Sequence, residues 1–267
     1  LNDGGCDGVA PIGTTGEGAS VSIDDRIKLP KLFFKASIPA DRVIIGTGHP
    51  STPDTARLSK AALEYGYVNQ LVVPPFYYKS VGDDGLYDYF SYMIKTINSE
   101  NLRIYLYHFP QVSMVPISVD LVMRLKNEFG PIIAGLKDSS GDFSQSLAFT
   151  KATGGINQDF DVYPSSEAFY FKGIQAGCAG IISGSTNVFA TLVQAAINSP
   201  EGPESNEFKK VIEARSFAGK FNLMAAMKAA EAKRTADESW ERLAPPLQKL
   251  NKEDKQKLYD GLSKIFA

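Results

Sequence analysis

The segment Gly135 to Asp142, which reads GLKDSSGD, carries the side chain with the clearest chemical potential in the chain, that of Lys137. The apolar run Ile132-Ile133-Ala134 before it predicts a buried strand, so Lys137 stands where that strand runs out into a loop. A lysine at such a place is either a solvated loop residue near Asp138 or a catalytic amine. An amine held among apolar walls loses its proton more easily and can attack a ketone to form a Schiff base.

A second polar segment, Gly13-Thr14-Thr15-Gly16-Glu17, follows the first predicted strand. Its glycines would let the backbone approach a ligand, and the hydroxyls of Thr14 and Thr15 with nearby N–H groups could hold a carboxylate. A plain glycine turn is the alternative. The spacing matches neither the dinucleotide-binding fingerprint nor a phosphate-binding loop.

Aromatic side chains end two further strands, in Pro74-Pro75-Phe76-Tyr77-Tyr78 and in Tyr107-His108-Phe109-Pro110. Such runs are usually core or interface, but the Tyr107 phenol at a strand end could relay protons to an atom near Lys137. His108 should point the opposite way, and we predict a structural role for it. Metal binding is disfavoured because His49 is the only other imidazole in the sequence.

The segment Ser165-Ser166-Glu167 ends another predicted strand. Its side chains could cap the helix that follows or could hydrogen-bond a hydroxylated substrate.

These residues belong to a chain in which strand-like apolar runs alternate with helical patterns, as is typical of a parallel α/β fold. Strands are predicted at 8–13, 42–46, 68–73, 103–107, in the run before Lys137, at 160–163 and at 180–183. Helices are predicted at 22–37, 52–65, 85–98, 118–129, 144–153, 167–176 and 188–197. Ser22, Thr52 and Ser118 are the predicted caps of the first, second and fourth helices.

Seven such units fall a little short of a (β/α)8 barrel, also called a TIM barrel, which typically spans about 250 residues. One strand–helix unit of roughly 30 residues is therefore expected to be missing from the front. We predict an α/β chain with the (β/α)8 barrel over 1–199 and a C-terminal helical extension over 200–267, made of two or three amphipathic helices.

Composition points to a soluble protein with a small-molecule substrate. Of 267 residues, 43% are hydrophobic and 22% charged, with a net charge of -2. The even mixture of charges gives no basic footprint for nucleic acid and no polybasic patch for a membrane. Cys6 and Cys178 are isolated, so a cytoplasmic location is expected. The chain starts without Met, so a lost transit segment, and with it a mitochondrial location, is the alternative.

Taken together, Gly13 to Glu17, Tyr77-Tyr78, Tyr107-x-x-Pro110 and GLKDSSGD resemble the dihydrodipicolinate synthase and N-acetylneuraminate lyase family of class I pyruvate-dependent aldolases. Their order and spacing agree over almost the whole chain. Gly177-x-x-Gly180-x-Ile182-Ser183-x-x-x-Asn187 and Arg242 to Leu247 also look like family signatures. The resemblance implies a barrel that binds pyruvate or another 2-oxo acid as an imine, without metal or organic cofactor. It also implies a homotetramer or homodimer.

Carried over by position, the resemblance makes Lys137 the Schiff-base lysine and Tyr107 the proton-relay phenol. Thr14 would link that phenol to Tyr78, which in this family often reaches into the neighbouring subunit's site. Thr15 would hold the pyruvyl carboxylate. The remaining candidate substrate-binding residues are Gly13, Ser165, Ser166 and Ile182.

One departure from the family pattern bears on the second substrate. In dihydrodipicolinate synthases the stretch after the tyrosine resembles Y-N-V-P-x-R, whose arginine grips a carboxylate, whereas Val112 stands at that place here. KDSSGD looks closer to the 4-hydroxy-2-oxoglutarate and 2-keto-3-deoxy acid aldolases. We therefore expect an aldolase acting on a hydroxylated 2-oxo acid. The alternatives are a dihydrodipicolinate synthase, a 2-keto-3-deoxy acid dehydratase and, last, a catalytically weak 2-oxo acid binder.

Overall fold

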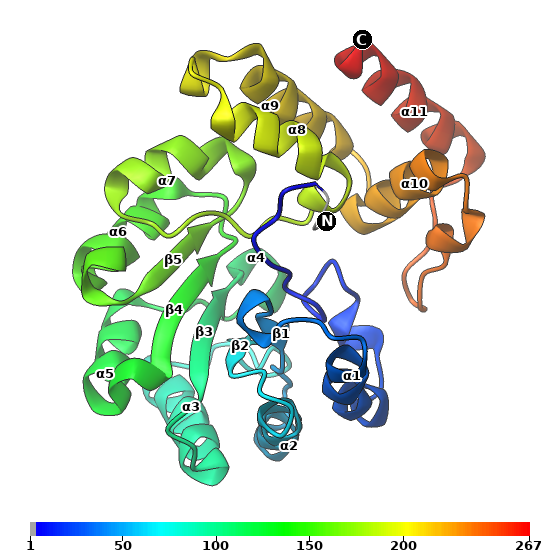
Figure 1. The fold of residues 1–267 in the computed structure, drawn as a ribbon. Coiled ribbons are helices and arrows are strands. Elements are labelled where there is room, and N and C mark those ends of the chain that lie inside the picture. The colour runs from blue at the N-terminus through cyan, green and yellow to red at the C-terminus, as the bar shows by residue number, and fades with distance from the viewer. Residues whose placement is uncertain (1–3) are drawn as a thin grey trace. The chain divides into compact units, whose positions relative to one another are not determined.

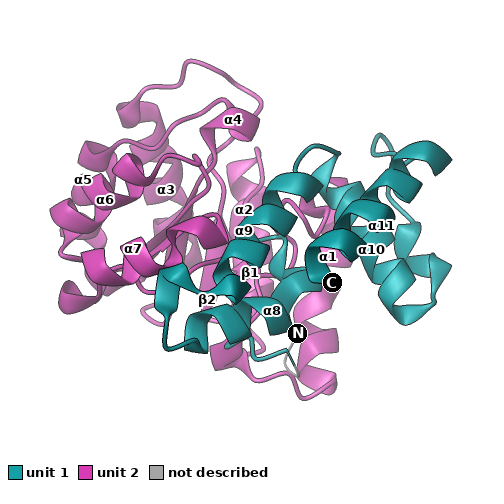
Figure 2. Ribbon diagram, turned by 90° about the horizontal axis from the view of Figure 1, so that it is seen from above, with its two compact units in different colours: residues 1–7, 183–267 teal, residues 8–182 magenta. Residues whose placement is uncertain are grey.

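The computed structural model describes residues 4–267, which fall into two compact units coloured separately in Figure 2. One unit comprises residues 8–182 and contains the strands. The other comprises residues 4–7 and 183–267 and is helical apart from its turns and loops.

The first of these units is built on five parallel strands (Figure 1). Each strand pairs with the next along the chain, in the order β1-β2-β3-β4-β5. Between one strand and the next the chain passes through at least one helix, as parallel pairing requires. The strands are β1 Ile45–Gly46, β2 Asn69–Val72, β3 Arg103–His108, β4 Ile133–Asp138 and β5 Asp161–Pro164.

Apart from the short α4, which was not predicted, the helices of this unit begin within about three residues of their predicted starts. They are α1 Ile23–Lys35, α2 Thr52–Leu63, α3 Asp83–Ile97, α4 Pro110–Ser113, α5 Val119–Phe129, α6 Phe143–Thr153 and α7 Tyr170–Ala176. Ser22 caps α1 by accepting from Asp25 N, and Ser118 caps α5 by accepting from Leu121 N. The predicted cap Thr52 was wrong by one residue, because the Ser51 side chain accepts from Asp54 N instead.

An apolar core fills the space between the sheet and α2, α3, α5 and α6. Leu106, Leu136 and Val162 enter it from three neighbouring strands, and Phe90 and Leu125 enter it from helices. All five are fully buried. Burial of this surface positions the strands, and with them the side chains of the opposite sheet face.

Two predicted strands do not form. The stretch 8–13 pairs only at Val9, which forms an isolated bridge with Val43. Pro11 has no N–H to donate, so the ladder cannot continue through it, although its carbonyl accepts from Gly46 N at 2.9 Å. The stretch 180–183 is not a strand either; just before it, Ala179 N donates to Val162 O at 3.0 Å.

The second unit contains the four long helices that end the chain. They are α8 Thr186–Asn198, α9 Asn206–Ala218, α10 Leu223–Thr235 and α11 Lys252–Phe266. The three that follow residue 200 agree with the predicted extension. The compact units divide after residue 182, and α8 groups with the later helices rather than with the strands. Whether residue 199 is the end of a folding domain stays a prediction.

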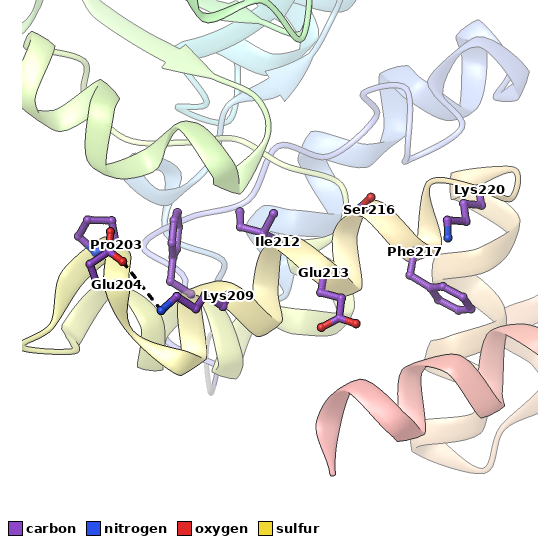
Figure 3. A pocket seen from close by; sticks show the side chains of 9 residues that line it. Pro203, Glu204, Lys209, Ile212, Glu213, Ser216, Phe217 and Lys220 are labelled. Carbon is purple, nitrogen blue, oxygen red and sulfur yellow. Dashed lines mark ion pairs between the residues drawn. The ribbon is translucent and has the colours of Figure 1, made fainter.

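A shallow hollow of about 610 Å³ lies along α9 and the turn before it (Figure 3). Phe208 and Ile212 form part of its lining, and Glu204 pairs with Lys209 across 3.9 Å at one end. The lining includes no tyrosine, histidine or cysteine and none of the site residues predicted from the sequence.

Candidate active site

The two faces of β3, β4 and β5 carry different chemistry. In the parallel register, Tyr107 is the partner of Lys137, and Lys137 is the partner of Tyr163. Directly paired residues share a face, whereas their neighbours in sequence point to the other one. The next pair along the strands, His108 and Asp138, therefore faces the helices. Only the first face brings an amine next to a phenol.

Lys137 is the penultimate residue of β4 and is only 8% exposed. Its Nζ donates to Ser139 Oγ at 3.0 Å and lies 4.1 Å from the centre of the Tyr107 ring. Among residues 4–267 no carboxylate forms a salt bridge with it. The alternative of a solvated loop residue near Asp138 does not hold, because Lys137 is buried within β4 and the Asp138 carboxylate accepts from Ser140 N and from Ser146 Oγ instead.

Tyr107 is 5% exposed, and its hydroxyl shares a hydrogen bond of 3.1 Å with Thr14 Oγ1. Burial by itself raises the pKa of this phenol. The positive charge of Lys137 and hydrogen bonds with Lys137, Thr14 and Ser139 outweigh burial and leave the pKa below its usual value. The phenol can therefore give up a proton more readily than a free tyrosine.

The loop that presents Thr14 is held by its own backbone. Gly18 N donates to Gly13 O and Glu17 N to Thr14 O, both at 3.1 Å. The left-handed conformations fall at Ile12, with φ 60°, and Glu17, with φ 56°, rather than at the glycines between them. That the glycines of this segment let the backbone approach a ligand stays a prediction; Gly16 also serves packing, since a Cβ there would lie 2.9 Å from Ile12 N.

Thr15 and Gly13 are half-buried in this loop beside Thr14. No hydrogen bond of the Thr15 side chain is seen in the described part of the chain. Their role as a carboxylate cradle stays a prediction.

Tyr78 is not joined to Thr14 in the described chain. Its side chain is 71% exposed, and its ring packs edge-on against Tyr77 at 5.3 Å. Lys79 fastens this loop by donating to Ser113 O at 3.0 Å and to Phe76 O. The predicted link from Tyr107 through Thr14 thus forms in its first half only, within one chain.

Ser165 and Ser166 follow β5 and are half-buried. Ser165 N donates to Asp138 O at 2.8 Å, which places the pair one strand away from Lys137. The Ser166 side chain makes no capping hydrogen bond at the short 3-10 helix Glu167–Phe169, so the capping alternative is not seen there. Ile182 is half-buried in the irregular segment after α7. Substrate binding by these three residues stays a prediction.

His108 lies on the helix side of the sheet, as its position next to Tyr107 predicts. It is 1% exposed, its Nδ1 accepts from Ile117 N at 3.0 Å, and its Nε2 bonds Gln145 Oε1 at 2.7 Å. With both nitrogens engaged inside the fold, His108 cannot also bind a substrate hydroxyl on the other face.

Sequence reasoning missed three residues around the reactive pair. Ser139 bonds both Lys137 and Tyr107, and only its place two residues after the lysine could have indicated this. The Phe109 ring stacks on that of Tyr107 at 5.8 Å and 26°. Tyr163 lies next to Lys137 in the strand register.

Residues 4–267 contain no candidate metal site and no candidate membrane span. No three His, Cys, Asp or Glu side chains in this range are grouped so that they could hold a metal ion. No helix in it is long and apolar enough to cross a membrane.

Comparison with known proteins agrees with this arrangement. Residues 1–264 match the dihydrodipicolinate synthetase family. An uncharacterised DapA-like lyase of Chloroflexus aurantiacus is 32% identical, with 100% of this chain and 88% of the relative covered. A 4-hydroxy-tetrahydrodipicolinate synthase of Listeria innocua is 29% identical over 79% of this chain and 68% of its own length.

Solved structures agree as well. A dihydrodipicolinate synthase from Agrobacterium tumefaciens superposes with a TM-score of 0.90 at 32% identity, covering 100% of this chain and 90% of that one. A Sulfolobus solfataricus 2-keto-3-deoxygluconate aldolase variant shares the fold, with a TM-score of 0.83 at 19% identity over 99% and 86% of the two chains. The predicted (β/α)8 class is thereby confirmed. The chain belongs to the dihydrodipicolinate synthetase family and is an enzyme of its lyase and aldolase class.

Proposed function

We propose that this protein is a class I aldolase that cleaves a hydroxylated 2-oxo acid into pyruvate and an aldehyde through an imine on Lys137. One observation carries the proposal. A buried lysine without a carboxylate partner in the described chain lies 4.1 Å from the ring of a tyrosine whose hydroxyl is bound to a threonine. A buried amine next to a phenol that can carry a proton is what imine chemistry needs.

The reaction begins when the Lys137 Nζ attacks the C2 carbonyl carbon of the substrate. The carbonyl oxygen leaves as water, and an iminium forms between Nζ and C2. The positive nitrogen then accepts the electron pair of the C3–C4 bond, which makes that bond easier to break. Thr15 and the N–H groups of its loop would hold the substrate carboxylate and so present one face of C2 to the amine.

Tyr107 is the proton carrier in this scheme. Its phenolate form takes the proton from the C4 hydroxyl, the C3–C4 bond breaks, and the C4 fragment leaves as an aldehyde. The electron pair stays on C3 as an enamine, which then takes a proton at C3. Water adds to C2 and frees pyruvate from Nζ. The lowered pKa of Tyr107 favours the first of these proton transfers. The scheme uses no metal or organic cofactor.

The side chains near the site indicate which 2-oxo acid is the substrate. Val112, at the place of a carboxylate-binding arginine, is 57% exposed at the end of α4, and a valine cannot pair a distal carboxylate. Ser165 and Ser166 offer neutral hydroxyls, which suit 4-hydroxy-2-oxoglutarate or a 2-keto-3-deoxy sugar acid. His108 offers no hydrogen bond to such a substrate, because both of its nitrogens are engaged elsewhere.

A second candidate is the condensation of pyruvate with aspartate semialdehyde. It is favoured by the Listeria relative, a 4-hydroxy-tetrahydrodipicolinate synthase, and by the Agrobacterium relative, a dihydrodipicolinate synthase. Both candidates use the same imine and differ only in the partner of pyruvate.

Two experiments test the proposal. Borohydride reduction with pyruvate, followed by peptide mass analysis, should modify Lys137; an unmodified Lys137 rules out the imine. Cleavage of 4-hydroxy-2-oxoglutarate and several 2-keto-3-deoxy acids is then compared with condensation of pyruvate and aspartate semialdehyde. Efficient condensation with the hydroxy acids left uncleaved would establish the second candidate. Dehydration without cleavage would indicate a dehydratase. The absence of any turnover would indicate a protein that only binds 2-oxo acids.

A matched pair of variants sharpens the choice of substrate. Val112→Arg restores the missing cation and should raise condensation with aspartate semialdehyde relative to cleavage, whereas Val112→Leu changes only size and should not. If neither changes the ratio, position 112 does not select the substrate.

The assembly and location complete the proposal. We expect a homotetramer or homodimer in which the exposed Tyr78 reaches the site of a neighbouring copy, and a cytoplasmic or mitochondrial location.

A further inference from the structure

A second polar group lies on the same sheet face as Lys137, one layer earlier along the strands. Tyr105 precedes Tyr107 by two residues and is the register partner of Gly135, which in turn pairs with Asp161. Residues two apart on a strand share a face and lie about 7 Å apart. Tyr105 and Asp161 are therefore directly below the reactive pair and play no part in the proposed mechanism.

Gly135 makes room for this layer. A Cβ at Gly135 would lie 2.8 Å from two carbons of the Tyr105 ring and 2.3 Å from Asp161 O. The ring of Tyr105 therefore fills the space that a side chain two residues before Lys137 would occupy. The tyrosine is 8% exposed and closes the floor beneath the amine.

Asp161 connects two aromatic rings. The Tyr105 hydroxyl donates to Asp161 Oδ2 at 3.0 Å, and the Tyr163 hydroxyl also hydrogen-bonds the carboxylate. The two rings lie 6.1 Å apart, tilted by 45°. Tyr163 is the register partner of Lys137 and so lies beside it, whereas Tyr105 lies one layer below. Asp161 therefore holds one ring below the amine and one ring beside it.

No basic side chain of the described chain forms a salt bridge with the Asp161 carboxylate. Arg103, at the start of β3, donates to the carbonyls of Glu100 and Leu102, both at 2.8 Å. Burial raises the pKa of Asp161, and nearby Asp159 adds to the shift, while the two phenols oppose it. A half-buried carboxylate held by two tyrosines, without a cation, is costly to keep unless its geometry serves the site above it.

We propose that Asp161 is a positioning residue that, by holding the rings of Tyr105 and Tyr163, keeps the Lys137 side chain aimed at the substrate carbonyl. Lys137 then has an aromatic wall on each side, Tyr107 and Tyr163, and an aromatic floor in Tyr105. This inference rests on the proposed function for its chemistry but concerns a different residue. Without the carboxylate, the two phenols lose their common acceptor and both rings gain freedom next to the amine.

The test compares Asp161→Ala and Asp161→Asn with Asp159→Asn in the full-length protein. Asp159 is an exposed residue with φ 50°, a conformation that asparagine accepts readily, so its variant removes one negative charge without touching the network. Imine formation with pyruvate, kcat and KM are measured for each variant. Asp161→Ala should slow imine formation and lower kcat by about 10- to 100-fold, because a shift of the reacting atom of about 1 Å costs that much.

KM should stay within about twofold, since the loop at Thr14 and Thr15 is untouched. Asp161→Asn keeps an acceptor for one phenol and should fall between Asp161→Ala and the wild type. Asp159→Asn should equal the wild type. Equal rates for Asp161→Ala and Asp159→Asn would overturn the inference, and so would a rise in KM with unchanged kcat. If Asp161→Ala fails to fold, the inference is tested with Asp161→Asn and Tyr163→Phe. Wild-type rates in both variants would overturn the positioning role of Asp161.

A second readout does not depend on pyruvate. The rate at which acetic anhydride modifies Lys137 is read by peptide mass against Lys151, an exposed lysine on α6. This ratio should change in Asp161→Ala and stay constant in Asp159→Asn; a constant ratio in both counts against the inference. If the wild-type protein traps no pyruvate, the proposed function fails while the labelling ratio still tests Asp161.

Discussion

The register pairs Tyr107–Lys137 and His108–Asp138 lie next to each other on β3 and β4, are all at least 92% buried, and face opposite sides of the sheet. On the helix side, the two residues bond fixed partners: Gln145 and Ile117 N for His108, Ser140 N and Ser146 for Asp138. On the other side, the amine and the phenol have mainly each other, Thr14 and Ser139.

This contrast shows that burial alone does not distinguish a reactive group from a structural one. A donor or acceptor whose capacity is used within the fold has nothing to offer a substrate. Lys137 has up to three N–H donors, and its hydrogen-bond partners in the described chain are the hydroxyls of Ser139 and Tyr107. Spare capacity in a buried group is costly for stability and is found where chemistry requires it.

The largest expected effect is on the reactive side. Lys137→Ala should lower turnover by at least about 10⁴-fold, because no other residue can form the imine. Stability, measured by urea unfolding, should change little, since few contacts are lost. Lys151→Ala, an exposed lysine on α6, is the control and should keep full turnover. Turnover of Lys137→Ala within tenfold of the wild type would show that the comparison assigns the wrong face.

Tyr107→Phe should slow turnover by about 10²–10⁴-fold, the usual value of one general acid–base residue. Imine trapping with pyruvate should persist, because the lysine remains. The control is Tyr92→Phe on α3, where the tyrosine is 56% exposed. Full activity in Tyr107→Phe would remove the phenol from the mechanism and leave the threonine and serine next to it to be tested.

A substitution on the helix side should lower the stability of the protein rather than its turnover. Asp138→Ala leaves Ser140 N and the Ser146 hydroxyl without their acceptor and should cost about 1–3 kcal/mol of unfolding free energy. Turnover per folded molecule should be unchanged. The exposed Asp88→Ala on α3 should stay within about 0.5 kcal/mol of the wild type. A loss of turnover at full stability in Asp138→Ala would break the division between the faces.

The smallest effect is spectroscopic. In a pH titration at 295 nm, the difference between the wild type and Tyr107→Phe should show a phenol whose pKa lies below the usual tyrosine value. Lys137→Met removes the charge that opposes burial, so the pKa of Tyr107 should rise. An unchanged pKa in Lys137→Met would mean that Thr14 and Ser139, rather than the amine, set the phenol's acidity.

Several features of the fold and the site could be predicted from the sequence, because they depend on local patterns such as helix caps and the alternation of side chains along a strand. The caps Ser22 and Ser118 are confirmed by their hydrogen bonds, and alternation along a strand was enough to put His108 on the side away from Tyr107. The segments around Lys137, Tyr107 and Thr14 were found from residue type and position after a strand. The sequence did not predict that the stretches 8–13 and 180–183 would fail to form strands. Strand formation depends on hydrogen bonding to a neighbouring strand as well as on the hydrophobic pattern.

Sequence by itself therefore determined the family, the fold class and the identity of the candidate lysine. Only the tertiary structure decided which side chains meet: Lys137 with Tyr107 and Ser139, Asp138 with Ser146, and Tyr105 with Asp161 across 56 positions of sequence. Strand register brings such residues together, and it results from burial of one sheet face under the helices. A period along one strand carries no information about its partner on the next, and for that reason the layer beneath the lysine could not be predicted.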